Sequence, residues 1–388
     1  MFLNGNACIQ IQFRMKPFQV LFCAVLALAA FAFSAAAQPH ARPRRPNIIL
    51  IVADGLGAGD LSCYGQTQFQ TPHLDRLAAG GIQFTNYTAG GASSAAASAA
   101  LMLGKNTSYL PDADYSLNGD DVTIAQMLYR SGYSTCLIGE WNLGDENSAG
   151  APWRQGFHEF AGYFDPADCK NVYPDYLWKY DETPVPDGNE RVFNGREMLY
   201  DNTGGRKEMY MPDVFLQWAV NFSKQHKQDP FNHHQPFFLM VNETIPGNGN
   251  REVPTDAPFS DEPWPQAERN RAATIARLDD SIGNLVDQLS AMDEASNTVI
   301  IFTSDTVPKK GDGVDPKFFH ENAGADDLHV PLIVSWPGKI PGGQVSDVNC
   351  SARDILPTAA AFALAQSPQN VDGVSLLPAM FGREARKK

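Results

Sequence analysis

The sequence is short of basic residues. Its 388 residues include 30 lysines and arginines against 44 aspartates and glutamates, which gives a formal net charge of −14. Binding to a phosphate backbone needs a basic surface, so this composition argues against nucleic acid as a partner. Hydrophobic residues make up 43% of the chain and aromatic residues 11%, which is enough for a substantial core.

Cysteine is also scarce. Two of the six cysteines lie in the apolar N-terminal region, and the other four are widely spaced, at Cys63, Cys136, Cys169 and Cys350. Their spacing matches no metal-ligand pattern. A disulfide among the four is one reading, and separate buried thiols are the reading that we favour.

No long hydrophobic run occurs after residue 33. Before it, Arg14 and Lys16 precede an apolar run over 20–33, and Ser34 and three alanines follow. This pattern is typical of a secretory signal peptide over residues 1–37, with Met15 as an alternative start. It predicts a secreted or periplasmic protein with a linker over 38–45 and no stable membrane span after cleavage; an uncleaved anchor is the alternative.

Residues 46–57 read PNIILIVADGLG. Six apolar residues from Ile48 to Ala53 follow one another without alternation, which predicts a parallel strand covered on both faces. Asp54 comes directly after it, at the strand end where open α/β sheets place their ligands. The alternative is that this aspartate caps the next turn.

Helical and strand patterns alternate along the rest of the chain. Further strands are predicted over 82–86, 134–138, 237–241, 298–303 and 330–335. Helices are predicted over 95–103, 123–131, 212–226 and about 267–292, and between a cap at Thr71 and glycines at 80 and 81. The alternation predicts an α/β domain over 46–388, with a largely parallel central sheet flanked by helices on both faces.

With these pieces placed, the chain resembles the sulfatase family of the alkaline phosphatase superfamily. Successive blocks of the family appear in order from Pro46 to Pro378, among them ADGLGAGDLSCYGQ, TPHLDRLAAGGIQFTNY, LMLGK, GEWNLG, YPDYLW, IIFTSD and VPLIVSWPGKIPGG. Many sulfatases continue into a smaller antiparallel subdomain. The resemblance therefore implies the sulfatase fold. We expect the C-terminal subdomain to be missing from this sequence, which extends to Lys388.

The resemblance also implies a nucleophile position. Family members hydrolyse sulfate esters with a formylglycine made from the first residue of a Cys/Ser-x-Pro-x-Arg motif at a helix N-terminus, where backbone N–H groups favour a developing oxyanion. In this sequence the position is Ser94. Ala96 and Ser98 replace the proline and the arginine, so the motif is degenerate.

The family holds a divalent cation, calcium or magnesium, between two pairs of side chains. Asp54 and Asp305 remain, but Gly55 and Thr306 stand at the partner positions. A hard cation takes six or more oxygen ligands. The expectation is therefore that no cofactor is bound, with calcium or magnesium as the cofactor if the site functions.

The family's sulfate clamp is altered as well. Glu140 and Asn142 stand where the resemblance implies a lysine and a histidine in the pocket, and Gly247 follows Pro246 where members have a histidine. Unit charges about 4 Å apart interact by roughly 4 kcal/mol near a surface, so a glutamate in place of the lysine would turn attraction of sulfate into repulsion. The alternative for Glu140 is a solvated loop carboxylate.

These changes fall on the nucleophile motif, the metal ligands and the sulfate clamp, whereas the patterns of strands, helices and turns remain. This combination predicts a non-catalytic binding or accessory protein. One alternative is an active sulfuric ester hydrolase whose Ser94 is still oxidised. Another alternative is that Ser94 reacts directly with phosphate or other esters. Its hydroxyl would then need a base, and no histidine spacing points to Ser94.

A glycan partner, sulfated or neutral, is suggested by aromatic residues that could stack on sugars, with core packing as the alternative. These residues are Tyr173, Tyr176, Trp178 and Tyr180.

Overall fold

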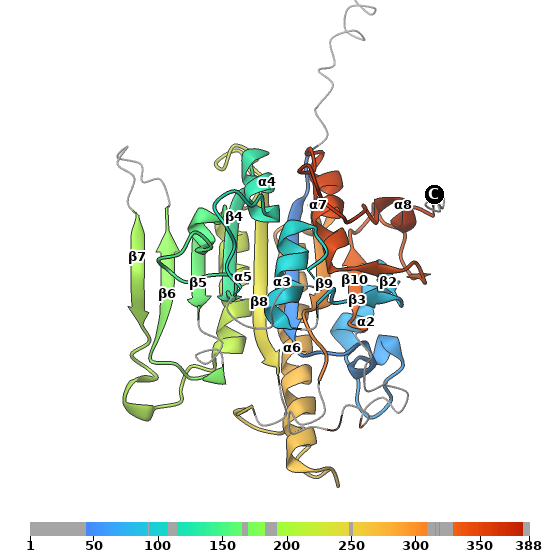
Figure 1. Cartoon of the computed structure of the whole chain (residues 1–388). Helices are drawn as coiled ribbons and strands as arrows, with labels where there is room; N and C mark the ends of the chain where they lie inside the picture. Colours follow the sequence, from blue (N-terminus) through green and yellow to red (C-terminus); the bar gives the residue numbers. More distant parts are fainter. Residues whose placement is uncertain are drawn as a thin grey trace, which may run out of the picture. The chain divides into compact units, whose positions relative to one another are not determined.

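One large sheet forms the centre of the computed structural model (Figure 1). The structure describes residues 44–91, 93–107, 115–164, 170–182, 192–247, 251–308, 315, 318 and 329–382. The predicted signal peptide and most of the linker lie outside these residues. All the elements below belong to one compact unit, Arg45–Lys388.

The sheet has ten strands. They are β1 (Asn47–Asp54), β2 (Ile82–Phe84), β4 (Ser134–Glu140), β5 (Glu159–Tyr163), β6 (Tyr176–Asp181), β7 (Phe193–Met198), β8 (Phe237–Pro246), β9 (Thr298–Ser304), β10 (Leu332–Ser335) and β11 (Gln344–Ser346). Their order is β11-β2-β10-β9-β1-β8-β4-β5-β6-β7. A separate two-stranded sheet pairs β3 (Tyr87–Thr88) with β12 (Cys350–Ser351).

The five central strands, β9-β1-β8-β4-β5, run parallel to one another. On one side β10 is antiparallel to both β9 and β2, and on the other β6 is antiparallel to both β5 and β7. The prediction of a largely parallel central sheet is confirmed. Its carboxyl edge gathers the ends of β1, β8 and β4 and the start of the segment after β9.

Helices cover both faces of the sheet, as predicted. On one face lie α3 (Ser94–Leu103), α4 (Ile124–Arg130) and α7 (Ile355–Ala363), and on the other α2 (Pro72–Ala79), α5 (Met211–Gln225) and α6 (Gln266–Ala291) (Figure 1). A short α8 (Leu377–Met380) packs near α7. No helix in the described part of the chain is both long and apolar enough to cross a bilayer.

Strand β1 supplies side chains to both layers of the core. Ile48 and Leu50 join the cluster under α3, α4 and α7, whereas Ile49 and Ile51 join the cluster under α2, α5 and α6. All four are fully buried. Each such side chain contributes about 1.5–3 kcal/mol by leaving water, which explains why this strand reads as an unbroken apolar run.

Three of the four cysteines after the apolar N-terminal run lie in described parts of the chain. Cys63, Cys136 and Cys350 are free thiols, and the last two are buried. This confirms the reading of separate thiols for these three. Cys169 lies outside the described residues.

Strand β8 carries a buried carboxyl group that forms no ion pair with any residue the structure describes. Glu243 is 1% exposed, and neither of its carboxylate oxygens has a well-formed hydrogen bond among the described residues. Burial raises the pKa of Glu243 well above its ordinary value of 4.5; the negative charge of Asp213 adds to this, and the amide of Thr244 offsets part of it.

This raised pKa predicts how stability depends on pH. The folded chain keeps a proton on Glu243 that the unfolded chain has already lost, so stability falls as pH rises above about 4.5. Glu243→Gln should therefore raise Tm at about pH 8 and leave it unchanged at about pH 4. Calorimetry of both proteins at the two pH values checks this, with the exposed Glu262→Gln as control. An equal effect of Glu243→Gln at both pH values would contradict it.

Candidate active site

The predicted site residues meet at the carboxyl ends of the central strands. Asp54 ends β1, Asp305 follows the neighbouring β9, and Asn142 lies two residues beyond β4. The Ser94 hydroxyl donates a hydrogen bond to Oδ2 of Asp305, and Nδ2 of Asn142 donates one to Ser94 Oγ over 2.8 Å. The structure thus joins three of the residues in one hydrogen-bonded chain, with Asp54 beside it.

The start of α3 positions Ser94. The preceding Ser93 is the N-cap, and its hydroxyl accepts a hydrogen bond from the amide of Ala96 at 3.2 Å. Such a cap fixes the first turn and leaves Ser94 as the first helical residue. Ala96 and Ser98, at the family's proline and arginine positions, are 2% and 7% exposed. The site therefore has no charged side chain at either of these two positions.

Asp305 has several hydrogen-bond donors. Its Oδ1 accepts hydrogen bonds from the Thr306 hydroxyl at 3.0 Å and from the Gly55 amide at 3.3 Å. Burial raises the pKa of Asp305, while the bonds from Ser94 and Thr306 work in the opposite direction. A carboxylate that accepts a hydrogen bond from a serine hydroxyl is placed to act as a base toward that serine. The base candidate is thus a carboxylate 211 residues away in the chain and not a histidine, which no spacing in the sequence indicates.

Asp54 has a different partner. Its Oδ2 lies 2.7 Å from Nη2 of Arg251, in an ion pair at the end of β1. Burial, followed by the charge of Asp305, raises the pKa of Asp54 to about 7, and Arg251 lowers it from what it would otherwise be. Arg251 was not among the residues predicted for the site.

The residues present do not fit a divalent cation. Three of the four carboxylate oxygens of Asp54 and Asp305 already have partners, which are Arg251, Ser94, and Thr306 with the Gly55 amide. A hard cation that takes six or more oxygens would meet few free ligands. It would also lie against the positive charge of the Arg251 guanidinium, which repels it.

Glu140 is not a solvated loop residue. It ends β4 and is 7% exposed, and its carbonyl oxygen accepts a hydrogen bond from Nδ2 of Asn242 at 2.8 Å. The alternative that placed it in a solvated loop is wrong, because the strand continues two residues beyond its predicted end. An acidic side chain is therefore buried where the resemblance implies the clamp lysine.

Arg271 of α6 ties the site's two glycine-containing loops together. Its guanidinium donates to the carbonyl oxygens of Gly55 and Gly247, each at 2.8 Å, and to Oδ2 of Asp60 at 2.6 Å. Arg271 is 2% exposed. It lies four residues before Ile275, on the apolar stripe of α6, and a charge at such a position was the signal that could have revealed it.

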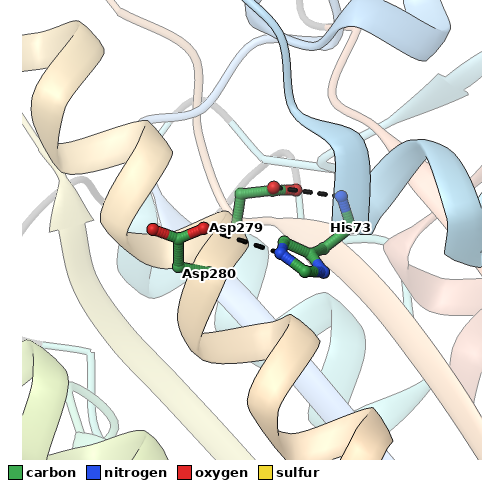
Figure 2. Close-up of side chains that lie close together, drawn as sticks. All are labelled: His73, Asp279 and Asp280. Carbon is green, nitrogen blue, oxygen red and sulfur yellow. Dashed lines mark hydrogen bonds and ion pairs between the residues drawn. The ribbon is translucent and has the colours of Figure 1, made fainter. Parts of the chain in front are cut away.

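A second group of possible metal ligands lies elsewhere in the described part of the chain: His73, Asp279 and Asp280 (Figure 2). Asp279 is 1% exposed, and its two oxygens accept the amides of His73 and Leu74 at 3.0 and 2.7 Å. His73 Nε2 lies 3.6 Å from Asp280, whose side chain is 79% exposed. Asp279, on α6, thus accepts hydrogen bonds from backbone amides in the first turn of the neighbouring helix α2. These bonds account for its burial.

The aromatic residues considered for glycan binding are partly packed. Tyr180 stacks on Trp153 with ring centroids 4.9 Å apart. The guanidinium of Arg196 on β7 lies over the Tyr176 ring at 4.4 Å and over the Trp178 ring at 5.7 Å. Tyr176 and Trp178 therefore form, with an exposed arginine, a cationic aromatic surface on one face of β6 and β7.

Comparison with known proteins agrees with the fold. The family model described as Sulfatase matches residues 46–364, so the chain belongs to the sulfatase family. It is 30% identical to N-acetylgalactosamine-6-O-sulfatase of Bacteroides thetaiotaomicron, over 76% of this chain and 68% of that protein. It is 29% identical to arylsulfatase A of Bos taurus, over 92% of this chain and 71% of that protein.

Solved structures show the same likeness. The structure described as Ps i-CgsB in complex with k-i-k-neocarrahexaose matches with a TM-score of 0.69 and 26% identity, covering 88% of this chain and 77% of that one. Sulfatases typically use a divalent metal such as calcium, so the ion pair at Asp54 sets this chain apart from what its family implies.

Asp279 should matter for stability and not for metal binding. Asp279→Ala leaves two amides of α2 without acceptors and should cost about 1–3 kcal/mol of unfolding free energy. Asp280→Ala, its exposed neighbour, should change the unfolding free energy by less than about 0.5 kcal/mol. Urea unfolding with and without calcium measures both. A calcium-dependent gain in the parent that Asp280→Ala removes would show a metal site there instead.

Proposed function

We propose that this member of the sulfatase family does not cleave sulfate esters by the formylglycine route and acts as a secreted binding or accessory protein. The observation that carries the proposal is the charge of the site. Asp54, Asp305 and Glu140 gather at one edge of the sheet, and the arginine beside them, Arg251, is already paired. Where the resemblance implies a clamp lysine that attracts sulfate, this site has the buried carboxyl group of Glu140. The secreted location rests on the N-terminal sequence pattern.

The proposed partner is a glycan, sulfated or neutral. The names of the relatives support a carbohydrate, since they include an N-acetylgalactosamine-6-O-sulfatase and a protein in complex with a neocarrahexaose. On this chain, the surface of Tyr176, Trp178 and Arg196 has the chemistry for it. Aromatic rings stack on sugars, and a guanidinium binds sulfate through paired N–H groups.

The absence of formylglycine chemistry is directly testable. The protein should not turn over a chromogenic sulfate ester, and mass spectrometry should find an unmodified serine at Ser94 after expression in a host that matures other sulfatases. The reason is that the motif's proline and arginine are replaced by Ala96 and Ser98. Turnover that Ser94→Ala abolishes, together with an oxidised residue 94, would establish the active sulfatase instead.

A second candidate is favoured by one contact, the hydrogen bond from Ser94 to Asp305. With Asp305 as base, Oγ of Ser94 could attack a phosphate or carboxylic ester directly while its proton passes to the carboxylate; the ester bond to the alcohol then breaks, and the alcohol leaves with that proton. A panel of chromogenic phosphate and carboxylic esters tests this. If it holds, Ser94→Ala and Asp305→Asn should each lower the rate by about 10²–10⁴-fold; if the panel shows no turnover, the binding role stands.

The glycan surface has a matched control on the opposite face of the same two strands. Arg196→Ala and Trp178→Ala should each weaken retention in affinity electrophoresis through a sulfated polysaccharide. Lys179→Ala removes a lysine that pairs with Glu197 at 3.0 Å and should leave retention unchanged. Unaltered far-UV circular dichroism would show that the variants are folded. Equal retention of all three variants and the parent would rule out this surface.

A further inference from the structure

The carboxyl edge of the sheet contains a buried positive charge that belongs to the chain itself. Arg251 follows the end of β8 by a few residues, and its side chain is 9% exposed. Its Nη2 reaches Oδ2 of Asp54 at 2.7 Å. A guanidinium this deeply buried needs a close anionic partner, because the loss of its hydration is otherwise uncompensated. Asp54 is that partner.

The guanidinium can take this position because residue 247 is a glycine. Gly247 has a φ of +58°, and a Cβ at this residue would lie 2.2 Å from Nε and 3.0 Å from Cζ of Arg251. Any side chain at position 247 and the present conformation of Arg251 therefore exclude each other. The resemblance to sulfatases implies a histidine at this position, so the same change removes a family side chain and opens the space for Arg251.

The surrounding backbone holds the glycine against Asp54. The Gly247 amide donates to the carbonyl oxygen of Asp54 at 2.8 Å, and the Gly247 carbonyl accepts from Arg271 at 2.8 Å. The same Arg271 binds the carbonyl of Gly55 at 2.8 Å. The turn after β8 is thus fixed to the turn after β1, and this holds Arg251 and Asp54 close to each other.

We propose that Arg251 takes the place of the family's divalent cation, as a built-in counter-ion to Asp54, and that Gly247 is the substitution that admits it. The site is then assembled by folding alone and does not bind calcium or magnesium. This inference goes beyond the proposed function, since it holds whether or not Ser94 reacts with an ester.

The first test is a calcium titration of the full chain after treatment with a chelator. Calorimetry should show no saturable heat with calcium chloride, and Tm should be the same in calcium and in EDTA. Arg251→Lys, which keeps the charge, should behave like the parent. Saturable calcium binding by the parent that Asp54→Asn abolishes would overturn the proposal, and the binding measurement itself uses the parent protein alone.

The second test is a double-mutant cycle in thermal unfolding. Arg251→Gln leaves Asp54 without its counter-ion and should lower Tm by several degrees, and adding Asp54→Asn should recover most of that loss. Gly247→Ala should lower Tm as well, through the strain of a side chain at a φ of +58° and through displacement of the guanidinium. The control cycle uses Arg269 and Asp256, an ion pair at 3.0 Å with both side chains 21% exposed, where the coupling should be smaller than at Arg251 and Asp54. Additive effects at Arg251 and Asp54 would overturn the proposal.

Discussion

Acidic side chains buried at the end of a parallel sheet must be matched by positive charges or hydrogen-bond donors, and the rest of this site depends on that requirement. Asp60 is matched by Arg271, Asp54 by Arg251, and Asp305 by hydroxyl and amide donors. Each match also fixes a loop. The charges that neutralise the site are therefore the same groups that hold its backbone in shape.

The scaffold and the chemistry of the site rest on different interactions. The apolar strand β1 and the helices on both faces form a core that does not involve Ser94 or Asp305. The hydrophobic packing of the core is therefore separate from the polar contacts at the carboxyl edge. Because of this separation, a sulfatase fold can persist while individual residues at that edge differ between members.

The central elements could be predicted from the sequence because their signals are local. The apolar run of β1 and the apolar stripe of α6 each lie within one element, and the structure confirms both. Strands β5, β6 and β7 were missed because polar and half-exposed residues interrupt their patterns. Strand β8 runs beyond its predicted end at residue 241 because buried polar residues, among them Glu243, continue it.

The site could be predicted in part, through the family resemblance. Ser94 and Asp305 are 211 residues apart in the chain, and no periodicity brings such residues together. The expectation that they lie close together came from the order of the sequence blocks that resemble the family. Arg251 lies outside every block, and its role depends on a tertiary contact with Asp54 that no local pattern records.

The contact between Gly247 and Arg251 also couples the two positions. A side chain at position 247 collides with the guanidinium in its present conformation, and removing the guanidinium alone leaves Asp54 buried without its neutralising charge. The effect of a substitution at one of these positions therefore depends on the residue at the other. A redesign of this edge of the sheet has to choose residues 247 and 251 together.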